Sequence, residues 1–163
     1  LFLLGNRFSL EDKRRNYDFY EQVTTHDSSL STCIFSIVAN EIGYHEQAYD
    51  YFASTSRMDL DDYHRNVGDG VHIANMAGTW MGVVNGFAGL RVYDGVIHLN
   101  PSLPKQWNGY SFRIRIHDHM LQVRIGGGNI ALDIVEGDAL SLFCYGESAA
   151  VKPGTSSVVP LRG

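Results

Sequence analysis

Residues 69–84 read DGVHIANMAGTWMGVV. The segment is apolar on nearly every side of a helical projection, which predicts a helix that is buried all round. Gly78 and Gly82 fall on one stripe of that helix. Because glycine costs about 1 kcal/mol inside a helix, the pair predicts a close crossing between helices. A membrane-spanning GxxxG helix is disfavoured, because the segment is too short and carries His72 and Asn75.

The residues before this segment also carry apolar side chains at helical spacing. They predict three further helices, over about residues 10–22, 30–42 and 45–54. With the segment at 69–84 they form an all-helical part of four helices. Such a part, with a last member that is apolar all round, needs further partners to bury its surface.

Local signals mark the ends of the predicted helices. Ser9 and Asp12 have the spacing of a capping box at the start of the first helix. Asp27 or Ser28 can cap the start of the second helix. Gly43 can end the second helix in the left-handed conformation.

From about residue 90 the spacing of apolar residues changes to a period of two. Phe112, Ile114 and Ile116 are expected to face inward, with charged residues between them facing outward. The pattern predicts strands over residues 111–117, 120–125, 130–135 and 140–145, with edge strands near residues 151 and 158–159. The predicted fold class is therefore α then β, with the helices followed by a small antiparallel β-sandwich domain.

Composition narrows the class of protein. The chain has 163 residues, of which 44% are apolar, 12% aromatic and 19% charged, so it can bury a core and is not disordered. The formal net charge is −5, which disfavours nucleic acid as a partner. No apolar run is long enough to span a bilayer, so no membrane partner is expected either.

The chain begins at Leu1, inside an apolar run and without an initiator methionine, so it is expected to be cut from a longer protein. Cys33 and Cys144 each lie in an apolar stretch. Two buried thiols in a reducing cytosol are the preferred interpretation over a disulfide. Neither cysteine has the spacing of a metal ligand.

Two loops that lead into helices are candidate anion sites. In the first, His26-Asp27-Ser28-Ser29 precedes the second helix, where hydroxyls, unpaired N–H groups and the helix dipole favour an anion. Capping alone would also explain these residues. In the second, glycines precede His72, which is either a satisfied core histidine or a donor to an anion held near Ser28 and Ser29.

Other polar clusters are interpreted without a ligand. His117 and His119 flank a turn at Asp118 and have no Cys or further His nearby in the sequence, so no metal site is predicted. Asp59, Asp61 and Asp62 lack the ligand ladder of a cation loop and are interpreted as a solvated acidic loop.

Several ordered motifs carry a family resemblance. They are LGNRFS at 4–9, NYDFYE at 16–21, TTHDSSLS at 24–31, DGVHIA at 69–74, AGTW at 77–80, VVNGF at 83–87 and LNPSLPKQW at 99–107. Together they resemble glycoside hydrolase family 65, and within it the maltose phosphorylases. The resemblance covers nearly the whole chain and is weaker after Tyr110.

The resemblance implies an inverting phosphorylase that cleaves maltose with inorganic phosphate to β-glucose 1-phosphate and glucose. Residues 1–88 would be the last helices of an (α/α)6 catalytic barrel and residues 89–163 its C-terminal β-sheet domain. Phosphate would be bound by Ser28, Ser29 and His72, with no metal and no cofactor. The whole enzyme would be a cytoplasmic homodimer, and the partners of this chain would be the disaccharide, phosphate and the remainder of the barrel.

Two parts of the family's active site are not matched in this chain. The family's general acid, a glutamate, and a Lys-Gln pair of the phosphate site are expected upstream, and Lys105-Gln106 belongs to the C-terminal motif instead. The chain alone is therefore expected to be inactive.

Other functions stay open. Kojibiose, nigerose or trehalose phosphorylases, or a hydrolase of the family, would share these motifs. A non-catalytic carbohydrate-binding β module would expose aromatic side chains on one sheet face, whereas Phe112, Phe143 and Tyr145 are interpreted mostly as core. A structural or oligomerisation segment is the third possibility.

Overall fold

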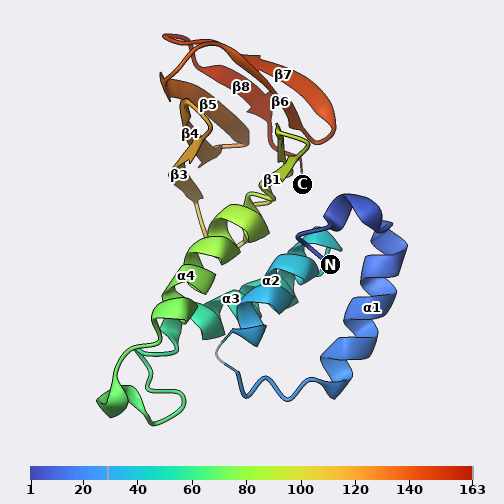
Figure 1. The fold of residues 1–163 in the computed structure, drawn as a ribbon, viewed down its shortest axis with the longest axis vertical. Helices are drawn as coiled ribbons and strands as arrows, with labels where there is room; N and C mark the ends of the chain where they lie inside the picture. The colour runs from blue at the N-terminus through green and yellow to red at the C-terminus, as the bar shows by residue number, and fades with distance from the viewer. Residues whose placement is uncertain (29, 163) are drawn as a thin grey trace. The chain divides into compact units, whose positions relative to one another are not determined.

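A computed structural model describes residues 1–28 and 30–162, and the chain divides into two units, Leu1–Gly86 and Phe87–Gly163. The first unit is helical and the second is built of β-strands (Figure 1). The predicted fold class, helices followed by a mainly antiparallel sheet domain, is confirmed.

The helical unit contains the four predicted helices. They are α1 (Leu10–Val23), α2 (Ser31–Glu41), α3 (His45–Arg57) and α4 (Ile73–Met81), with short 3-10 turns η1 (Gly5–Arg7) and η2 (Val67–Asp69) and a π-helical continuation of α4, η3 (Gly82–Phe87). The last helix begins later than predicted, because Gly70 has a φ of +126° that no right-handed helix admits. His72 is consequently the N-cap residue of α4 and not part of its first turn.

Two of the predicted helix ends are confirmed in detail. The Ser9 hydroxyl accepts a hydrogen bond from the Asp12 N–H at 3.1 Å, and the Asp12 carboxylate accepts one from the Ser9 N–H, which completes the capping box. At the end of α2, Gly43 has a φ of +88° and its N–H donates to Asn40 O. The Tyr44 N–H donates to Ala39 O at 2.8 Å, and together these bonds form a Schellman motif.

The glycines of α4 allow close helix crossings, as predicted, but with two different helices. A Cβ on Gly78 would lie 3.0 Å from Cys33 Cβ of α2, and a Cβ on Gly82 would lie 2.8 Å from Phe52 Cδ2 of α3. Farther along, the buried Asn40 side chain of α2 donates to Gly86 O at 3.0 Å. These contacts advance in the same direction along α2 and along α4 with η3, so α2 runs parallel to α4 and η3.

The prediction that residues 69–84 are buried all round is wrong for this chain. Ile73 is 74% exposed, Met76 51% and Trp80 49%. In the described part of the helical unit, α2 and α3 pack on α4 and cover a stripe that includes Asn75 and Gly78. An apolar helix face is thus left uncovered in the described chain.

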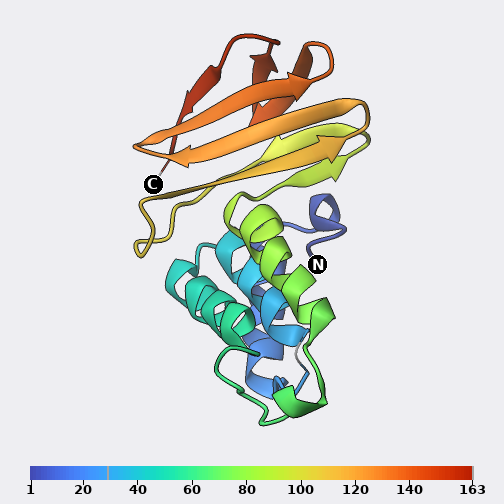
Figure 2. The same ribbon diagram turned by 90° about the vertical axis from the view of Figure 1, so that its left-hand side faces the viewer.

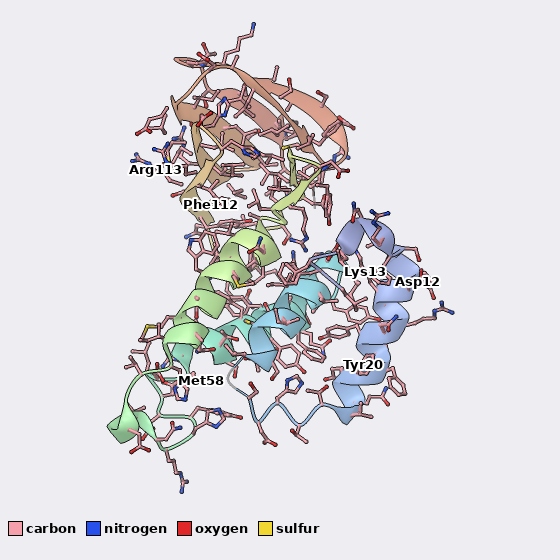
Figure 3. All side chains as sticks on the ribbon, viewed as in Figure 1. Asp12, Lys13, Tyr20, Met58, Phe112 and Arg113 are labelled. Carbon is pink, nitrogen blue, oxygen red and sulfur yellow. The ribbon has the colours of Figure 1, made fainter. Side chains whose placement is uncertain are left out.

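An ion pair joins α1 to α2. Lys13 of α1, labelled in Figure 3, is 4% exposed, and its Nζ lies 2.5 Å from Glu41 Oε1. Burying a lysine costs free energy unless a partner balances its charge, and Glu41 supplies that charge at the C-terminal end of α2.

Two four-stranded sheets make up the second unit, with strand orders β1-β2-β6-β7 and β3-β4-β5-β8 (Figure 2). The strands are β1 (Arg91–Tyr93), β2 (Val96–Leu99), β3 (Gly109–Ile116), β4 (His119–Gly126), β5 (Asn129–Glu136), β6 (Leu140–Cys144), β7 (Glu147–Val151) and β8 (Ser157–Pro160). All pairs are antiparallel except β2 with β6, which is parallel. The sequence did not predict β1 and β2, because three or four residues are too few to show alternation.

The alternation predicted for β3 is present, with half-buried Phe112, Ile114 and Ile116 between exposed neighbours. The interpretation of the aromatic residues as core needs correction. Phe143 is half-buried and alternates with the buried Leu142 and Cys144, and its ring stacks on His98 at a centroid distance of 5.1 Å. Phe112 and Tyr145 are likewise half-buried and not core.

Both cysteines are free and buried, as predicted. Burial raises the pKa of the Cys33 thiol and raises that of Cys144 to about 11, so both stay protonated and unreactive near neutral pH. None of the helices in residues 1–28 and 30–162 combines the length and the apolar character needed to cross a bilayer.

Gly89 and Gly95 offer a matched test of the sheet unit. Both have positive φ, +60° and +79°, but a Cβ on Gly89 would lie 2.6 Å from Asn100 O, whereas a Cβ on Gly95 meets nothing within 4 Å. We expect Gly95→Ala to cost about 1–2 kcal/mol, the strain of a left-handed non-glycine residue. Gly89→Ala should cost at least about 1 kcal/mol more, because the backbone must also move. Urea unfolding followed by circular dichroism measures both, and equal costs would contradict the close approach.

Candidate functional site

The first predicted anion loop precedes α2 and contains Ser28. The Ser28 hydroxyl accepts a hydrogen bond from the Leu30 N–H at 3.3 Å, and its carbonyl accepts from the Ser31 N–H at 3.1 Å. The prediction that Asp27 or Ser28 caps α2 is wrong, because the N-cap is Leu30 and no side chain caps the helix. A serine hydroxyl donates as well as accepts, so this geometry leaves the Ser28 hydrogen for a bound anion. Ser29, the second predicted ligand, lies outside the described residues.

The second predicted loop places His72 against Asp59. One Asp59 oxygen accepts the His72 backbone N–H at 2.9 Å, and the other lies 2.5 Å from His72 Nδ1. These bonds hold the pKa of the Asp59 carboxyl below its ordinary value. Because Asp59 is a carboxylate, Nδ1 carries a proton, and Nε2 is the ring nitrogen left to contact a ligand.

Asp59 is a candidate site residue that sequence reasoning missed. It was interpreted with Asp61 and Asp62 as a solvated acidic loop, and the other two fit that description. Asp61 forms an exposed ion pair with Arg57 at 2.6 Å, and Asp62 accepts from the Val67 N–H. Asp59 lies 13 residues before its partner, and no local spacing signal marks a pair of that kind.

A set of buried hydrogen bonds places the two loops at the same end of the helical unit. Thr55, near the end of α3, has its hydroxyl 2.8 Å from the Thr32 hydroxyl in the first turn of α2. The Asn75 side chain, in the first turn of α4, donates to Thr55 O at 2.6 Å. The three side chains are buried. The starts of α2 and α4 therefore lie beside the end of α3, as Figures 1 and 2 both show.

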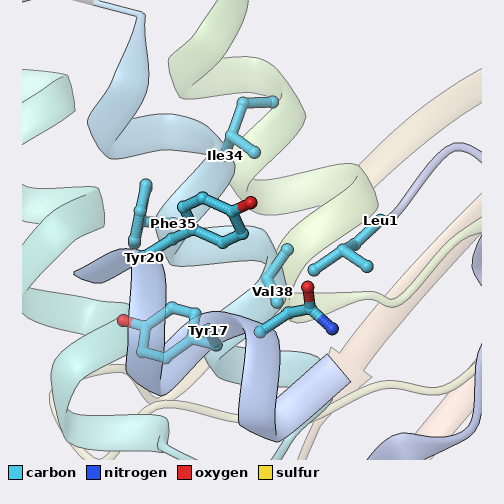
Figure 4. A pocket seen from close by; sticks show the side chains of 7 residues that line it. Leu1, Tyr17, Tyr20, Ile34, Phe35 and Val38 are labelled. Atoms are coloured by element: carbon cyan, nitrogen blue, oxygen red, sulfur yellow. The ribbon is translucent and has the colours of Figure 1, made fainter. Parts of the chain in front are cut away.

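An apolar pocket of about 150 Å³ lies between α1 and α2 (Figure 4). Its lining residues are Leu1, Asn16, Tyr17, Tyr20, Ile34, Phe35 and Val38. None of them carries a charge, so the pocket does not have the chemistry of an anion site. Among the described parts of the chain, no three His, Cys, Asp or Glu residues are grouped to hold a metal ion.

Family models match both units of the chain. The model described as the glycosyl hydrolase family 65 central catalytic domain matches residues 1–81, and that of the C-terminal domain of the same family matches residues 90–151. The chain therefore belongs to glycosyl hydrolase family 65. Both candidate loops lie in the part that matches the catalytic domain.

Relatives in this family include phosphorylases of several disaccharides. The chain is 47% identical over 154 residues to an alpha,alpha-trehalose phosphorylase of Thermoanaerobacter brockii, covering 94% of this chain and 20% of the relative. It is 36% identical over 152 residues to the maltose phosphorylase of Bacillus subtilis, covering 93% and 20%.

One solved structure, from the human microbiome and provisionally named kojibiose phosphorylase, has a TM-score of 0.93 and 33% identity. The match covers 99% of this chain and 24% of that one. The chain spans about a fifth of the length of the curated relatives it matches.

Asp59→Asn, with Asp61→Asn as the matched control, tests whether Asp59 supports an anion at His72. In the complete protein, we expect Asp59→Asn to weaken the binding of inorganic phosphate about tenfold, because a charge-assisted hydrogen bond to the ring becomes a neutral one. Asp61→Asn removes an equal charge from the surface pair with Arg57 and should leave the affinity within about twofold. Isothermal titration with phosphate measures both. A similar loss in both variants would show a general charge effect.

Proposed function

We propose that this chain is part of an inverting disaccharide phosphorylase, which cleaves an α-linked glucose disaccharide with inorganic phosphate to β-glucose 1-phosphate and glucose. The observation that carries the proposal is the arrangement of Ser28 and His72. They lie on two loops at one end of the helical unit, in a chain of a family whose relatives include phosphorylases.

The chemistry of the loops suits a phosphate that attacks a sugar. Ser28 donates a hydroxyl hydrogen, the dipole of α2 favours an anion at its N-terminal end, and His72 Nε2 shares a proton with a phosphate oxygen in either direction. The attacking phosphate oxygen forms a bond to the anomeric carbon as the glycosidic C–O bond breaks. A carboxylic acid protonates the departing oxygen. Phosphate needs no activating base, whereas a hydrolase needs a second carboxylate to activate water.

The general acid, the Lys-Gln pair and most of the residues that contact the disaccharide belong, in this proposal, to the rest of the catalytic barrel. The apolar face of α4 that contains Ile73, Met76 and Trp80 is exposed in this chain. An uncovered apolar face costs free energy in water, which supports packing of the rest of the barrel on this face. Ser29 completes the phosphate site beside Ser28 in this proposal.

The substrate within the class is the finer part of the proposal. The motifs resemble maltose phosphorylases, which favours maltose. The overall identity favours trehalose, because the trehalose phosphorylase from Thermoanaerobacter brockii shares more residues with this chain than the maltose phosphorylase does. Trehalose and maltose are therefore the first two disaccharides to test, with kojibiose and nigerose next.

We also propose a cytoplasmic homodimer that needs no metal and no cofactor. Two free, buried cysteines suit a reducing compartment. Acid catalysis with phosphate as co-substrate requires no further group. The net charge of −5 disfavours nucleic acid as a partner.

The phosphate requirement is the direct test of the reaction class. We expect the complete protein to release glucose from trehalose or maltose only when inorganic phosphate is present, with β-glucose 1-phosphate formed in equal amount. Anomer-resolved NMR of the products measures both quantities. Glucose release at an undiminished rate in phosphate-free buffer would assign a hydrolase instead.

The purified 163-residue chain is expected to show no phosphorolysis by itself. A well-placed general acid contributes about 10²- to 10⁴-fold, and loss of the sugar-binding residues lowers the rate further. The assay uses phosphate with each of the two disaccharides, with and without the upstream part of the enzyme added in trans. Turnover by the chain alone would place an acid within it, with Asp27 and Asp69 as the candidates.

A further inference from the structure

His26, two residues before Ser28, sits in an unusual backbone conformation with both ring nitrogens engaged. Its φ is +57°, in the left-handed region that non-glycine residues rarely occupy. Nδ1 lies 3.1 Å from the Ser31 hydroxyl, and Nε2 lies 3.1 Å from the Tyr51 hydroxyl. The ring also packs edge-on against Phe35 at a centroid distance of 4.6 Å. These contacts hold a backbone geometry that would otherwise be unfavourable.

The hydrogen bonds that begin at His26 connect the loop to three helices, α1, α2 and α3. The Tyr51 hydroxyl, from α3, donates to Glu21 Oε1 near the end of α1 at 3.1 Å. The Gln47 side chain, also from α3, donates to the same oxygen at 3.2 Å. On the other side, the Ser31 hydroxyl donates to Ser28 O at 3.0 Å. We call this chain, from Glu21 through Tyr51, His26 and Ser31 to Ser28, the histidine relay.

The hydroxyl hydrogens of Ser31 and Tyr51 indicate how His26 is bonded. The hydrogen of the Ser31 hydroxyl goes to Ser28 O, so His26 Nδ1 must donate to Ser31 Oγ. The Tyr51 hydroxyl donates to Glu21 and also lies 3.1 Å from His26 Nε2, so it joins the histidine to the carboxylate. Burial and the Glu21 hydrogen bond raise the pKa of Tyr51 to about 12, so this hydroxyl keeps its hydrogen. Both ring nitrogens of His26 are thus held by hydroxyls that other residues fix in place.

His26 therefore differs from His72 in what it can do. Both of its ring nitrogens are used inside the chain, so it has none left for a ligand. His72 uses only Nδ1 in the bond to Asp59. The two histidines next to the two loops divide into a ligand candidate and a residue that acts through its neighbours.

We propose that His26 is a positioning residue for phosphate: it ties the loop that carries Ser28 to α1, α3 and the first residue of α2, and so holds the Ser28 hydroxyl ready for the anion. This inference rests on the proposed phosphorylase function. The relay ends on the Ser28 carbonyl, and a loop held at its backbone loses less freedom when phosphate binds. Because the relay ends on the residue that carries the proposed phosphate ligand, we expect its loss to affect phosphate and not the disaccharide.

Two variants of the complete protein break the relay at different points. His26→Asn keeps a residue that tolerates the left-handed conformation but is too short to bridge Ser31 and Tyr51. Tyr51→Phe keeps the aromatic packing and the backbone but removes the hydroxyl between Glu21 and His26. We expect each to raise the KM for phosphate about tenfold, with the KM for the disaccharide and kcat changed less than about threefold.

The double variant should raise the phosphate KM no more than the larger single effect, because both changes break one connected network. His45→Asn is the matched control. His45 also makes a hydrogen bond within the helical unit, from Nδ1 to Asn40 Oδ1 at 3.0 Å, but at the start of α3, away from Ser28. It should leave the phosphate KM unchanged.

The possible outcomes distinguish a failure of the relay inference from a failure of the proposed phosphorylase function. If the unaltered protein releases glucose without phosphate, the proposed function fails. If its turnover depends on phosphate but Tyr51→Phe leaves the phosphate KM unchanged, the relay inference alone fails. Equal rises in the KM for phosphate and for the disaccharide, or the same rise in His45→Asn, would also overturn it. Thermal melting of each variant identifies a loss of folding, and Tyr51→Phe decides if His26→Asn does not fold.

Discussion

The close approach of α4 to α2 at Gly78 and Cys33 is the constraint on which the rest of the helical unit depends. Glycine suits this approach, since a Cβ there would lie 3.0 Å from the Cys33 side chain, which would have to shift to make room. At that separation, the first turns of both helices reach the same residue of α3. Thr55 then links Thr32 and Asn75 through buried hydrogen bonds. A larger spacing would leave the buried Asn75 side-chain N–H without its partner, at a cost of about 1–3 kcal/mol.

This packing explains why two loops far apart in sequence can serve one ligand. Because α2 and α4 run parallel, they start at the same end of the helical unit. The loops that precede these two helices therefore lie at that end. The side chains at the two starts are then oriented by carboxylates from other elements. Asp59, just after α3, orients His72, while Glu21, near the end of α1, is connected to His26 through the Tyr51 hydroxyl. In both cases an acidic residue fixes a histidine, but only one histidine keeps a nitrogen for a ligand.

Most of the local structure was predictable from the sequence. Helical and alternating periods separated the two units, because each period is repeated over many residues. The capping box at Ser9 and the left-handed end at Gly43 were also predictable, because their partners lie within five residues. The start of α4 and the cap of α2 were not. Glycine allows both positive and negative φ, and leucine is not a residue that marks an N-cap, so neither Gly70 nor Leu30 indicated the helix start in the sequence.

The sequence by itself determined the class of fold, the family resemblance and the identity of Ser28 and His72 as candidate ligands. Only the tertiary structure decided that Asp59 pairs with His72 and that β2 pairs in parallel with β6. It also decided that both ring nitrogens of His26 form hydrogen bonds, with Ser31 and Tyr51. Periodic patterns and caps are short-range and leave a signature in neighbouring residues. A hydrogen bond between residues 13 or 25 positions apart leaves none, because it exists only once the helices have packed.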